Sequence, residues 1–480
     1  MPKPKCAIMS PLKIVRLALW QHLRGKIMLD YANNSCLYRD TLFMLHCIDL
    51  AWRTQTLTLP NPPVSALLLD KNYEIISVGL HLKAGKAHAE VLALLRGYEV
   101  LSKTKSGLDE SSDSKQIHDF LLQCHNGLFR DKILLITLEP CNHYGKTPPC
   151  AKLLSELKPA KVIIAFKDKW GKSSNGAKTL QKAGVQVEML AQSKMLDSSE
   201  HIKHKILDLL YPFLCLKERG RFNLFKLALR LNGEYKDGQI SGRTSRNFTH
   251  NQRCIAQNLI ISGRTAIKDK PRLDTRYASD FYALDSAMDS KINAVLDSTQ
   301  SKSNLAQNLP NVEILTRNPK AIMEQSSQIP LFSQTNRQVS IKTSPNELSL
   351  HNGFNIIEGG FPLLETLQDK IDILLLHFSP AILQKSSDTS HDNALKQLST
   401  KSNDNVLLQN LLRRFEILHT TILDDSLVGL FMQYFTSNSD NINIQNTKTT
   451  KIDSNKTTKK TAKKRIAKSQ DLLVWLKPIT

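Results

Sequence analysis

Four side chains that could bind and use a metal ion lie in two short stretches of the first half of the sequence. His88 and Glu90 lie in the run AGKAHAEVL, and Cys141 and Cys150 lie in the run LEPCNHYGKTPPC. One imidazole and two thiolates leave the fourth tetrahedral position of a zinc ion open, as in catalytic rather than structural zinc sites. Glu90 is close enough to the histidine to move protons for a water activated by the metal. The pattern predicts a catalytic zinc site.

Such a ligand set, with a glutamate that does not bind the metal, is typical of the hydrolytic deamination of nucleobase-like rings. One alternative is a closed structural zinc site, which requires a fourth protein ligand, and His143 is the candidate for it. Another is that the cysteines are ordinary thiols and His88 is a core histidine. The order of H-A-E, P-C and P-P-C, with a strand expected before them and a helix after, favours the catalytic site.

The residues around these motifs alternate between expected strands and helices. Residues 40–55 have the apolar spacing of a packing helix, and His88 and Glu90 open another helix. Pro148–Pro149 suits a first helical turn, so Cys150 is expected at a helix N-terminus, where the helix dipole favours a thiolate. A last helix is expected at Gly176–Ala183. The expected strands are Val64–Leu69, Glu74–Leu80, Lys132–Thr137, Lys161–Phe166 and Val185–Leu190. This alternation predicts a layered α/β domain.

A second α/β domain is expected from residue 221. Its predicted strands are Asn223–Ala228, Asn258–Ile261, Ala294–Leu296, Val312–Leu315, Asn355–Ile357 and Ile371–His377, with a closing hairpin from Phe415–Leu423 and Leu427–Phe435. The whole chain is then divided into a basic N-terminal extension (1–38), the metal-binding domain (39–195), a helical linker (196–220), the second domain (221–436, with an insertion near 383–405) and a basic, largely disordered tail (437–480).

The charge of the chain is concentrated at its ends. The formal net charge is +21, and residues 1–40 and 441–480 together carry 13 of these excess positive charges. A uniformly basic binding face is therefore not implied, and we expect no specific nucleic-acid partner, although basic tails can attract nucleic acid without specificity. A rival interpretation is a basic nucleic-acid-binding protein with a structural zinc, which predicts salt-sensitive binding by the tails.

Cysteine usage and hydropathy indicate the compartment. The eight cysteines are scattered and do not form a secreted disulfide framework, so a reducing cytoplasm is expected. No apolar run approaches the roughly 20 residues that span a bilayer. Residues 11–29 mix apolar and basic residues and could form a membrane-surface or targeting helix, but arginines interrupt it, and an extension without function is favoured.

The motifs resemble those of the bifunctional riboflavin-biosynthesis deaminase/reductase family. The resemblance rests on NP-x-V, H-x-x-AG-x-x-HAE and T-LEPC-x-H-x-GKTPPC, whose eight residues between the cysteines differ from the C-x-x-C of cytidine and tRNA deaminases. It implies a cytidine-deaminase-like three-layer α/β/α domain. It also implies that His88, Cys141 and Cys150 hold zinc, that Glu90 shuttles protons, and that three residues bind the pyrimidine. These three are Asn61, His81 and Lys146.

The second half extends the resemblance with FKLALRLNG, ISGRTSRNFTHNQR, ISGRTAIKDKPRLDTR, NAVLDS and IIEGG. It implies a dihydrofolate-reductase-like α/β domain that uses NADPH, with Lys226 beside the reacting centre. Phe225 and Leu227 should face away from Lys226, because side chains alternate along a strand. The implied substrate contacts are Arg253, Leu273, Arg276 and Glu358. The implied cofactor contacts are Ala228, Thr265, Asp269, Ser298 and Gly360.

Together these observations predict a bifunctional enzyme that acts on a phosphorylated pyrimidine. The first domain would deaminate 2,5-diamino-6-(5-phosphoribosylamino)pyrimidin-4(3H)-one with zinc, and the second would reduce the ribosyl chain to ribityl with NADPH. The sequence departs from the family pattern at Ser65, after Asp168, and at Arg230, Asn232 and Gln239. The last three suggest the alternative, a deaminase with an inactive reductase domain. A homo-oligomer is left open, and no membrane partner is expected.

Overall fold

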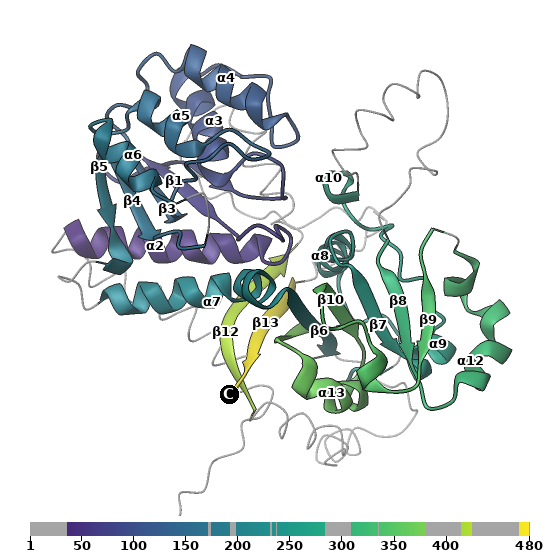
Figure 1. Ribbon diagram of the computed structural model, residues 1–480. Coiled ribbons are helices and arrows are strands. Elements are labelled where there is room, and N and C mark those ends of the chain that lie inside the picture. The colour runs from purple at the N-terminus through teal and green to yellow at the C-terminus, as the bar shows by residue number, and fades with distance from the viewer. Residues whose placement is uncertain are drawn as a thin grey trace, which may run out of the picture.

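The computed structural model of the protein describes residues 36–170, 174–192, 198–230, 233–236, 238–283, 309–334, 336–379, 414–424 and 470–479. These residues form a five-stranded and an eight-stranded sheet, each covered by helices (Figure 1). The expected α/β class is therefore confirmed for both halves of the chain. None of the helices in these ranges is both long enough and apolar enough to cross a bilayer.

The first sheet has the strand order β2-β1-β3-β4-β5. Its strands are β1 Ser65–Leu69, β2 Ile75–Leu80, β3 Ile133–Leu138, β4 Lys161–Phe166 and β5 Gln186–Met189. β1 is antiparallel to β2 and β3, whereas β3, β4 and β5 are parallel. Leu67 belongs to the core on one face and Leu68 to the core on the other. Burial on both faces explains why β1 and β3 are apolar throughout rather than alternating.

Helices cover both faces of this sheet, which gives the expected three-layer α/β/α domain (Figure 1). One face carries α2 (Cys36–Ala51) and α7 (Ser198–Arg219), and the other carries α3 (Ala89–Ser102), α4 (Ser114–Cys124), α5 (Cys150–Leu157) and α6 (Gly176–Lys182). The predicted helices at 40–55 and 176–183 are thus present. His88 is the N-cap of α3 and Cys150 is the first residue of α5, as expected.

The second sheet has the order β12-β13-β11-β6-β10-β7-β8-β9. Its strands are β6 Arg221–Arg230, β7 Asn258–Ser262, β8 Asn311–Leu315, β9 Val339–Lys342, β10 Gly353–Glu358, β11 Ile373–Ser379, β12 Phe415–Asp424 and β13 Gln470–Pro478. The six strands from β11 to β9 are parallel, and β13 is antiparallel to both β11 and β12. The short strand β9 was not foreseen from the sequence.

The remaining helices are short. They are α8 (Arg243–Arg253), α9 (Gly263–Asp269), α10 (Asp280–Ala283), α12 (Pro319–Glu324) and α13 (Phe361–Leu367), with 3-10 turns at Trp52–Thr54, Leu190–Gln192, Ser326–Gln328, Pro330–Ser333, Pro345–Glu347 and Gln368–Lys370. α13 packs with Phe225 and Leu227 on one face of the second sheet, and α8 lies on the other face with Leu224. Lys226 therefore projects away from Phe225 and Leu227, as predicted.

The expected disordered tail through residue 480 is wrong for its last part, because Gln470–Pro478 forms β13 inside the second sheet. Trp475 is fully buried, and its ring lies 5.7 Å from that of Trp52 in the first domain. The apolar run LLVWL at 472–476 lies within this strand. An apolar strand needs little local support when two neighbouring strands pair with it on both edges.

The expected linker at 196–220 is helical, but it does more than connect. The apolar stripe of α7, which includes Ile202, Ile206 and Leu209, lies in a hydrophobic cluster that contains residues of both sheets. Gln55 also donates a hydrogen bond to the Leu209 carbonyl at 2.6 Å. α7 is therefore part of a core shared by the two domains. The expected features at Ala294–Leu296, 383–405 and Leu427–Phe435 lie outside the described residues.

Candidate active sites

The three proposed metal ligands converge on one point. His88 Nδ1 lies 3.5 Å from Cys141 Sγ and 3.4 Å from Cys150 Sγ, and the three ligand atoms lie within 4.8 Å of one another. His143 lies on the rim of the adjoining cavity and is not a member of this group. Within the described residues the group has no fourth protein ligand and adjoins an open cavity, and such a donor set fits a catalytic zinc ion.

The neighbours of Cys141 prepare this donor for a cation. The Cys150 thiol and His88 lower the pKa of Cys141 and so favour its thiolate, although burial opposes this. His88 Nε2 lies 3.2 Å from the hydroxyl of Thr147, which leaves Nδ1 to face the two sulfurs. A second partner of this kind fixes the orientation of a ligand imidazole. Thr147 was not singled out from the sequence, although it stands within the GKTPPC motif.

Glu90 is buried in the first turn of α3, and it lines a cavity of about 350 Å³ together with His88 and Cys141. Burial raises the pKa of its carboxyl group to about 7. A carboxyl group that can exist in both protonation states near neutral pH suits general acid and base catalysis. The structure thus brings together all four residues that the sequence assigned to this chemistry.

The proposed pyrimidine contacts line the same cavity. Burial lowers the pKa of His81 to about 3, so its imidazole is neutral. His81 Nδ1 lies 3.2 Å from the Ala87 carbonyl and therefore donates to it, which leaves Nε2 to accept a hydrogen bond from Asn61 Nδ2 at 3.1 Å. This arrangement commits the Asn61 amide nitrogen to the protein and leaves its oxygen as an acceptor. Lys146 is exposed at the rim of the cavity.

A buried carboxylate that the sequence analysis missed holds the far wall of this cavity. Glu139 Oε2 accepts a hydrogen bond from the Asp168 amide at 3.1 Å, and Oε1 accepts one from Ala177 at 3.0 Å. Asp168 lines the cavity, and Ala177 lies in the first turn of α6. In the sequence, only the position of Glu139 between the expected strand and Cys141 indicated that this residue could belong to the site. Glu139 anchors the segment in which the sequence departs from the family pattern.

A larger cleft of about 940 Å³ lies on the second domain. It is lined by most of the residues assigned there by resemblance: Lys226, Ala228, Arg253, Thr265, Asp269, Leu273, Glu358 and Gly360. A side chain at Gly360 would bring Cβ to within 2.3 Å of the Tyr235 ring, so only glycine fits there. The volume and the basic side chains of Arg264 and Arg317 along the wall fit an anionic dinucleotide such as NADPH.

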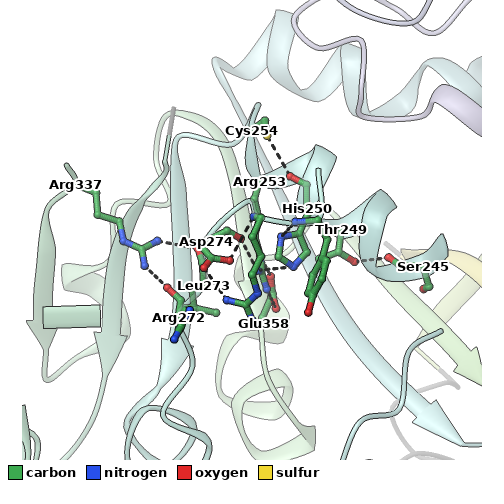
Figure 2. Close-up of polar contacts among 12 residues, drawn as sticks. Ser245, Thr249, His250, Arg253, Cys254, Arg272, Leu273, Asp274, Arg337 and Glu358 are labelled. Atoms are coloured by element: carbon green, nitrogen blue, oxygen red, sulfur yellow. Dashed lines mark hydrogen bonds and ion pairs between the residues drawn. The ribbon is translucent and has the colours of Figure 1, made fainter. Parts of the chain in front are cut away.

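Arg253 and Glu358 form a buried ion pair in this cleft (Figure 2). Arg253 Nε and Nη2 donate to the two oxygens of Glu358, each at 2.8 Å, and Nη1 donates to the Asp274 carbonyl at 3.0 Å. The guanidinium therefore uses most of its donors within the protein. A bidentate contact from Arg253 to a phosphate of the substrate would require Arg253 to leave Glu358.

Lys226 and Glu358 face each other across neighbouring strands, since they are register partners of β6 and β10. Burial lowers the pKa of Lys226, although Glu358 opposes this. Burial alone would raise the pKa of Glu358, but the attraction of Arg253, with a smaller effect of Lys226, lowers it to about 2. The cleft therefore holds a fixed anion next to an ammonium group that can release its proton more easily than usual.

One residue assigned by resemblance is not brought into this cleft, and another is not described. Arg276 is exposed, donates to Asp274 at 2.6 Å and is absent from the described cleft lining. Ser298 lies outside the described residues. Of the positions that depart from the family pattern, Arg230 is buried and donates to the Lys236 carbonyl at 3.0 Å, whereas Gln239 is exposed.

The family model that matches this chain describes the cytidine and deoxycytidylate deaminase zinc-binding region, and it covers residues 37–166. This range contains the whole zinc cluster and Glu90. The match to a deaminase zinc-binding region thus agrees with the three-layer fold of the first domain and with the geometry of its site.

The chain is also similar to curated proteins over about half of its length. The chain is 31% identical over 239 residues to riboflavin biosynthesis protein RibD of Mycobacterium tuberculosis, and 31% identical over 257 residues to the protein of the same name from Haemophilus influenzae. These matches cover 48% and 52% of this chain, and they span 59% and 57% of the relatives' own length. The resemblance inferred from the motifs is confirmed.

Among solved structures, the chain is similar to a Thermotoga maritima diaminohydroxyphosphoribosylaminopyrimidine deaminase/5-amino-6-(5-phosphoribosylamino)uracil reductase. The identity is 18%, the TM-score is 0.46, and the match covers 93% of this chain and all of the other.

Proposed function

We propose that the chain is a bifunctional enzyme of riboflavin biosynthesis. Its first domain removes the 2-amino group of 2,5-diamino-6-(5-phosphoribosylamino)pyrimidin-4(3H)-one as ammonia, and its second domain reduces the ribosyl chain of the product to ribityl. The observation that carries this proposal is the convergence of His88, Cys141 and Cys150 beside the buried Glu90. Relatives named as riboflavin-biosynthesis proteins support the substrate.

In the first domain, His88, Cys141 and Cys150 would hold zinc, which supplies a water molecule with a lowered pKa. Glu90 takes a proton from the attacking water and delivers it to the departing amino group, as the C–N bond breaks and a ring carbonyl forms. Asn61, oriented by His81, accepts a hydrogen bond from the pyrimidine, and Lys146 binds the anionic end of the substrate from the rim.

In the second domain, NADPH supplies the hydride that reduces the open-chain form of the sugar at its imine carbon. Lys226 donates a proton or a hydrogen bond to the imine nitrogen, and Glu358 keeps the ammonium group in place. Arg253 and Leu273 shape the substrate side of the cleft. Ala228, Thr265, Asp269 and Gly360 contact the cofactor. The proposed roles of Arg276 as a substrate contact and of Ser298 as a cofactor contact rest on the resemblance alone.

The proposal can be tested by incubating purified protein with the diaminopyrimidine phosphate, with and without NADPH, and identifying the products by mass. Without NADPH we expect only the deaminated product, in which a ring amino group has become a carbonyl. With NADPH the mass should increase by two hydrogens. Release of ammonia without any NADPH oxidation would instead support the alternative, a deaminase with an inactive second domain, to which Arg230 and Gln239 point.

The domain boundaries also remain part of the proposal. We place the metal-binding domain at 39–195 and the reductase domain from residue 221, with β13 added to the latter. α7 belongs to the shared core of the two domains rather than to a free linker. The proposed substrates are small molecules, and no nucleic-acid partner is required by either site.

A further inference from the structure

The loop between α9 and α10 forms one wall of the reductase cleft. Pro271 and Leu273 of this loop line the cleft, and the Leu273 side chain is almost fully buried. Leu273 has a φ of 51°, which places a leucine in the left-handed region. This backbone conformation is unfavourable for a residue with a Cβ and persists only where the surroundings hold it.

Two arginines hold three consecutive carbonyl groups of this loop (Figure 2). Arg337 donates to the carbonyls of Leu273, at 2.8 Å, and of Arg272, while Arg253 donates to that of Asp274 at 3.0 Å. Gln334 adds a bond to the Arg272 carbonyl at 3.0 Å. Side chains from two other segments of the chain therefore fix the conformation of the loop.

Arg337 differs from Arg253 in what it binds. Within the described residues no carboxylate lies within ion-pairing distance of Arg337, and its hydrogen bonds go to main-chain carbonyls. The planar guanidinium holds two neighbouring carbonyls with donors at a fixed spacing on separate nitrogens, whereas a lysine presents all its donors from one nitrogen. Its direct contacts are therefore with the main chain, so its contribution is to the geometry of the loop.

We propose that Arg337 is a positioning residue for the reductase site: by holding the Arg272 and Leu273 carbonyls, it keeps the Leu273 side chain in the wall that contacts the substrate. Arg337 does not touch the substrate itself. The inference rests on the proposed reductase function. Leu273 contacts the substrate in the proposed site, so a displacement of about 1 Å weakens substrate binding without unfolding the loop.

The test compares Arg337→Gln and Arg337→Lys with Arg272→Gln in the full-length protein. Arg272 is a matched control because it is exposed in the same loop, and its side chain makes no polar contact within the described residues. Two readouts are needed: amide hydrogen exchange of residues 272–277 without ligand, and steady-state reduction of the deaminated substrate.

For Arg337→Gln we expect faster exchange in this loop and a KM for the deaminated substrate raised about tenfold. kcat, the KM for NADPH and the deamination rate should remain within about threefold of the wild type, since Arg337 bonds neither to the proposed cofactor contacts nor to the residues of the zinc site. In Arg337→Lys the KM should rise less than in Arg337→Gln, because the ammonium group can still donate to a carbonyl. Arg272→Gln should match the wild type.

An unchanged KM in Arg337→Gln, or equal rises in the KM values of both ligands, would overturn the positioning role. Unchanged hydrogen exchange would overturn the claim that Arg337 holds the loop. If the wild-type protein never oxidises NADPH, the reductase assignment itself fails, and the hydrogen-exchange comparison still decides whether Arg337 fixes the loop.

Discussion

The two sites are built in different ways. The zinc cluster needs only the start of α3 and the segment that leads into α5, so its residues are fixed by short local motifs. The reductase cleft is assembled from the ends of β6 and β10, from α8 and α9, and from the loop that carries Leu273. Its charged side chains pair with one another. A local site can be found from its motifs, whereas a dispersed site depends on partners across the whole sheet.

The largest effect should follow from removing β13. A chain that ends at Lys468 leaves β11 and β12 without the strand that pairs with both. It also removes Trp475, and losing a buried tryptophan alone costs about 3–5 kcal/mol. We expect NADPH oxidation to be lost and the second domain to unfold cooperatively at a much lower temperature, as measured by calorimetry.

Deletion of 437–468 is the matched control for this truncation, because it removes a polar segment and keeps β13. Asp424 and Gln470 are register partners, so a short connection can join the two strands. This variant should keep both activities near the wild-type values. Normal NADPH oxidation in the chain that ends at Lys468 would show that the reductase site does not depend on its distant strand.

The second largest effect concerns the local site. Glu90→Gln keeps the shape of the side chain but cannot cycle a proton, so deamination should fall by about 10² or more. Zinc content and reduction of supplied deaminated substrate should be unchanged. Ammonia release, metal analysis and NADPH oxidation measure these outcomes. Glu156→Gln, an exposed position on α5, is the control. A parallel loss of both activities would contradict the separation of the two sites.

An intermediate effect is expected on stability from Glu358→Gln, which breaks the ion pair with Arg253. Removing one partner of a buried pair costs about 3–5 kcal/mol. The pKa of Glu358 falls from its ordinary 4.5 to about 2 on folding. The ionised Glu358 therefore contributes fully to the free energy of unfolding above pH 4.5, and this contribution is lost as pH falls toward 2. The difference in unfolding free energy between wild type and variant should shrink over this window, as denaturant titrations at several pH values can show. A constant difference would contradict this.

The smallest effect should come from a contact between the domains. Tyr282 donates a hydrogen bond to the Leu82 carbonyl at 2.8 Å, next to His81 of the zinc site. Tyr282→Phe should lower the unfolding free energy by about 1 kcal/mol, the typical value of one neutral hydrogen bond. If the sites act independently, the KM for each substrate should stay within about twofold of the wild type. A larger shift in the deaminase KM would show that they are coupled.

The contrast between the sites also explains what the sequence could predict. His88, Glu90, Cys141 and Cys150 were found together because strand and helix signals next to each motif fix where the side chains point. Arg253 was recognised, but its pairing with Glu358 was not, because the two residues are 105 positions apart and only the parallel sheet brings them together. Arg337 was missed because its partners are main-chain carbonyls, which leave no mark in a pattern of side chains.

The position of β13 has a consequence for synthesis of the protein on the ribosome. Ninety residues lie between Ser379, where β11 ends, and Gln470, where β13 begins. At usual translation speeds this interval lasts roughly 5–20 seconds. Until β13 emerges, the apolar strand β11 has an unpaired edge, which is a template for intermolecular strand pairing. Nascent chains should therefore depend on chaperones that bind extended apolar segments, and slowing translation after residue 379 should increase aggregation.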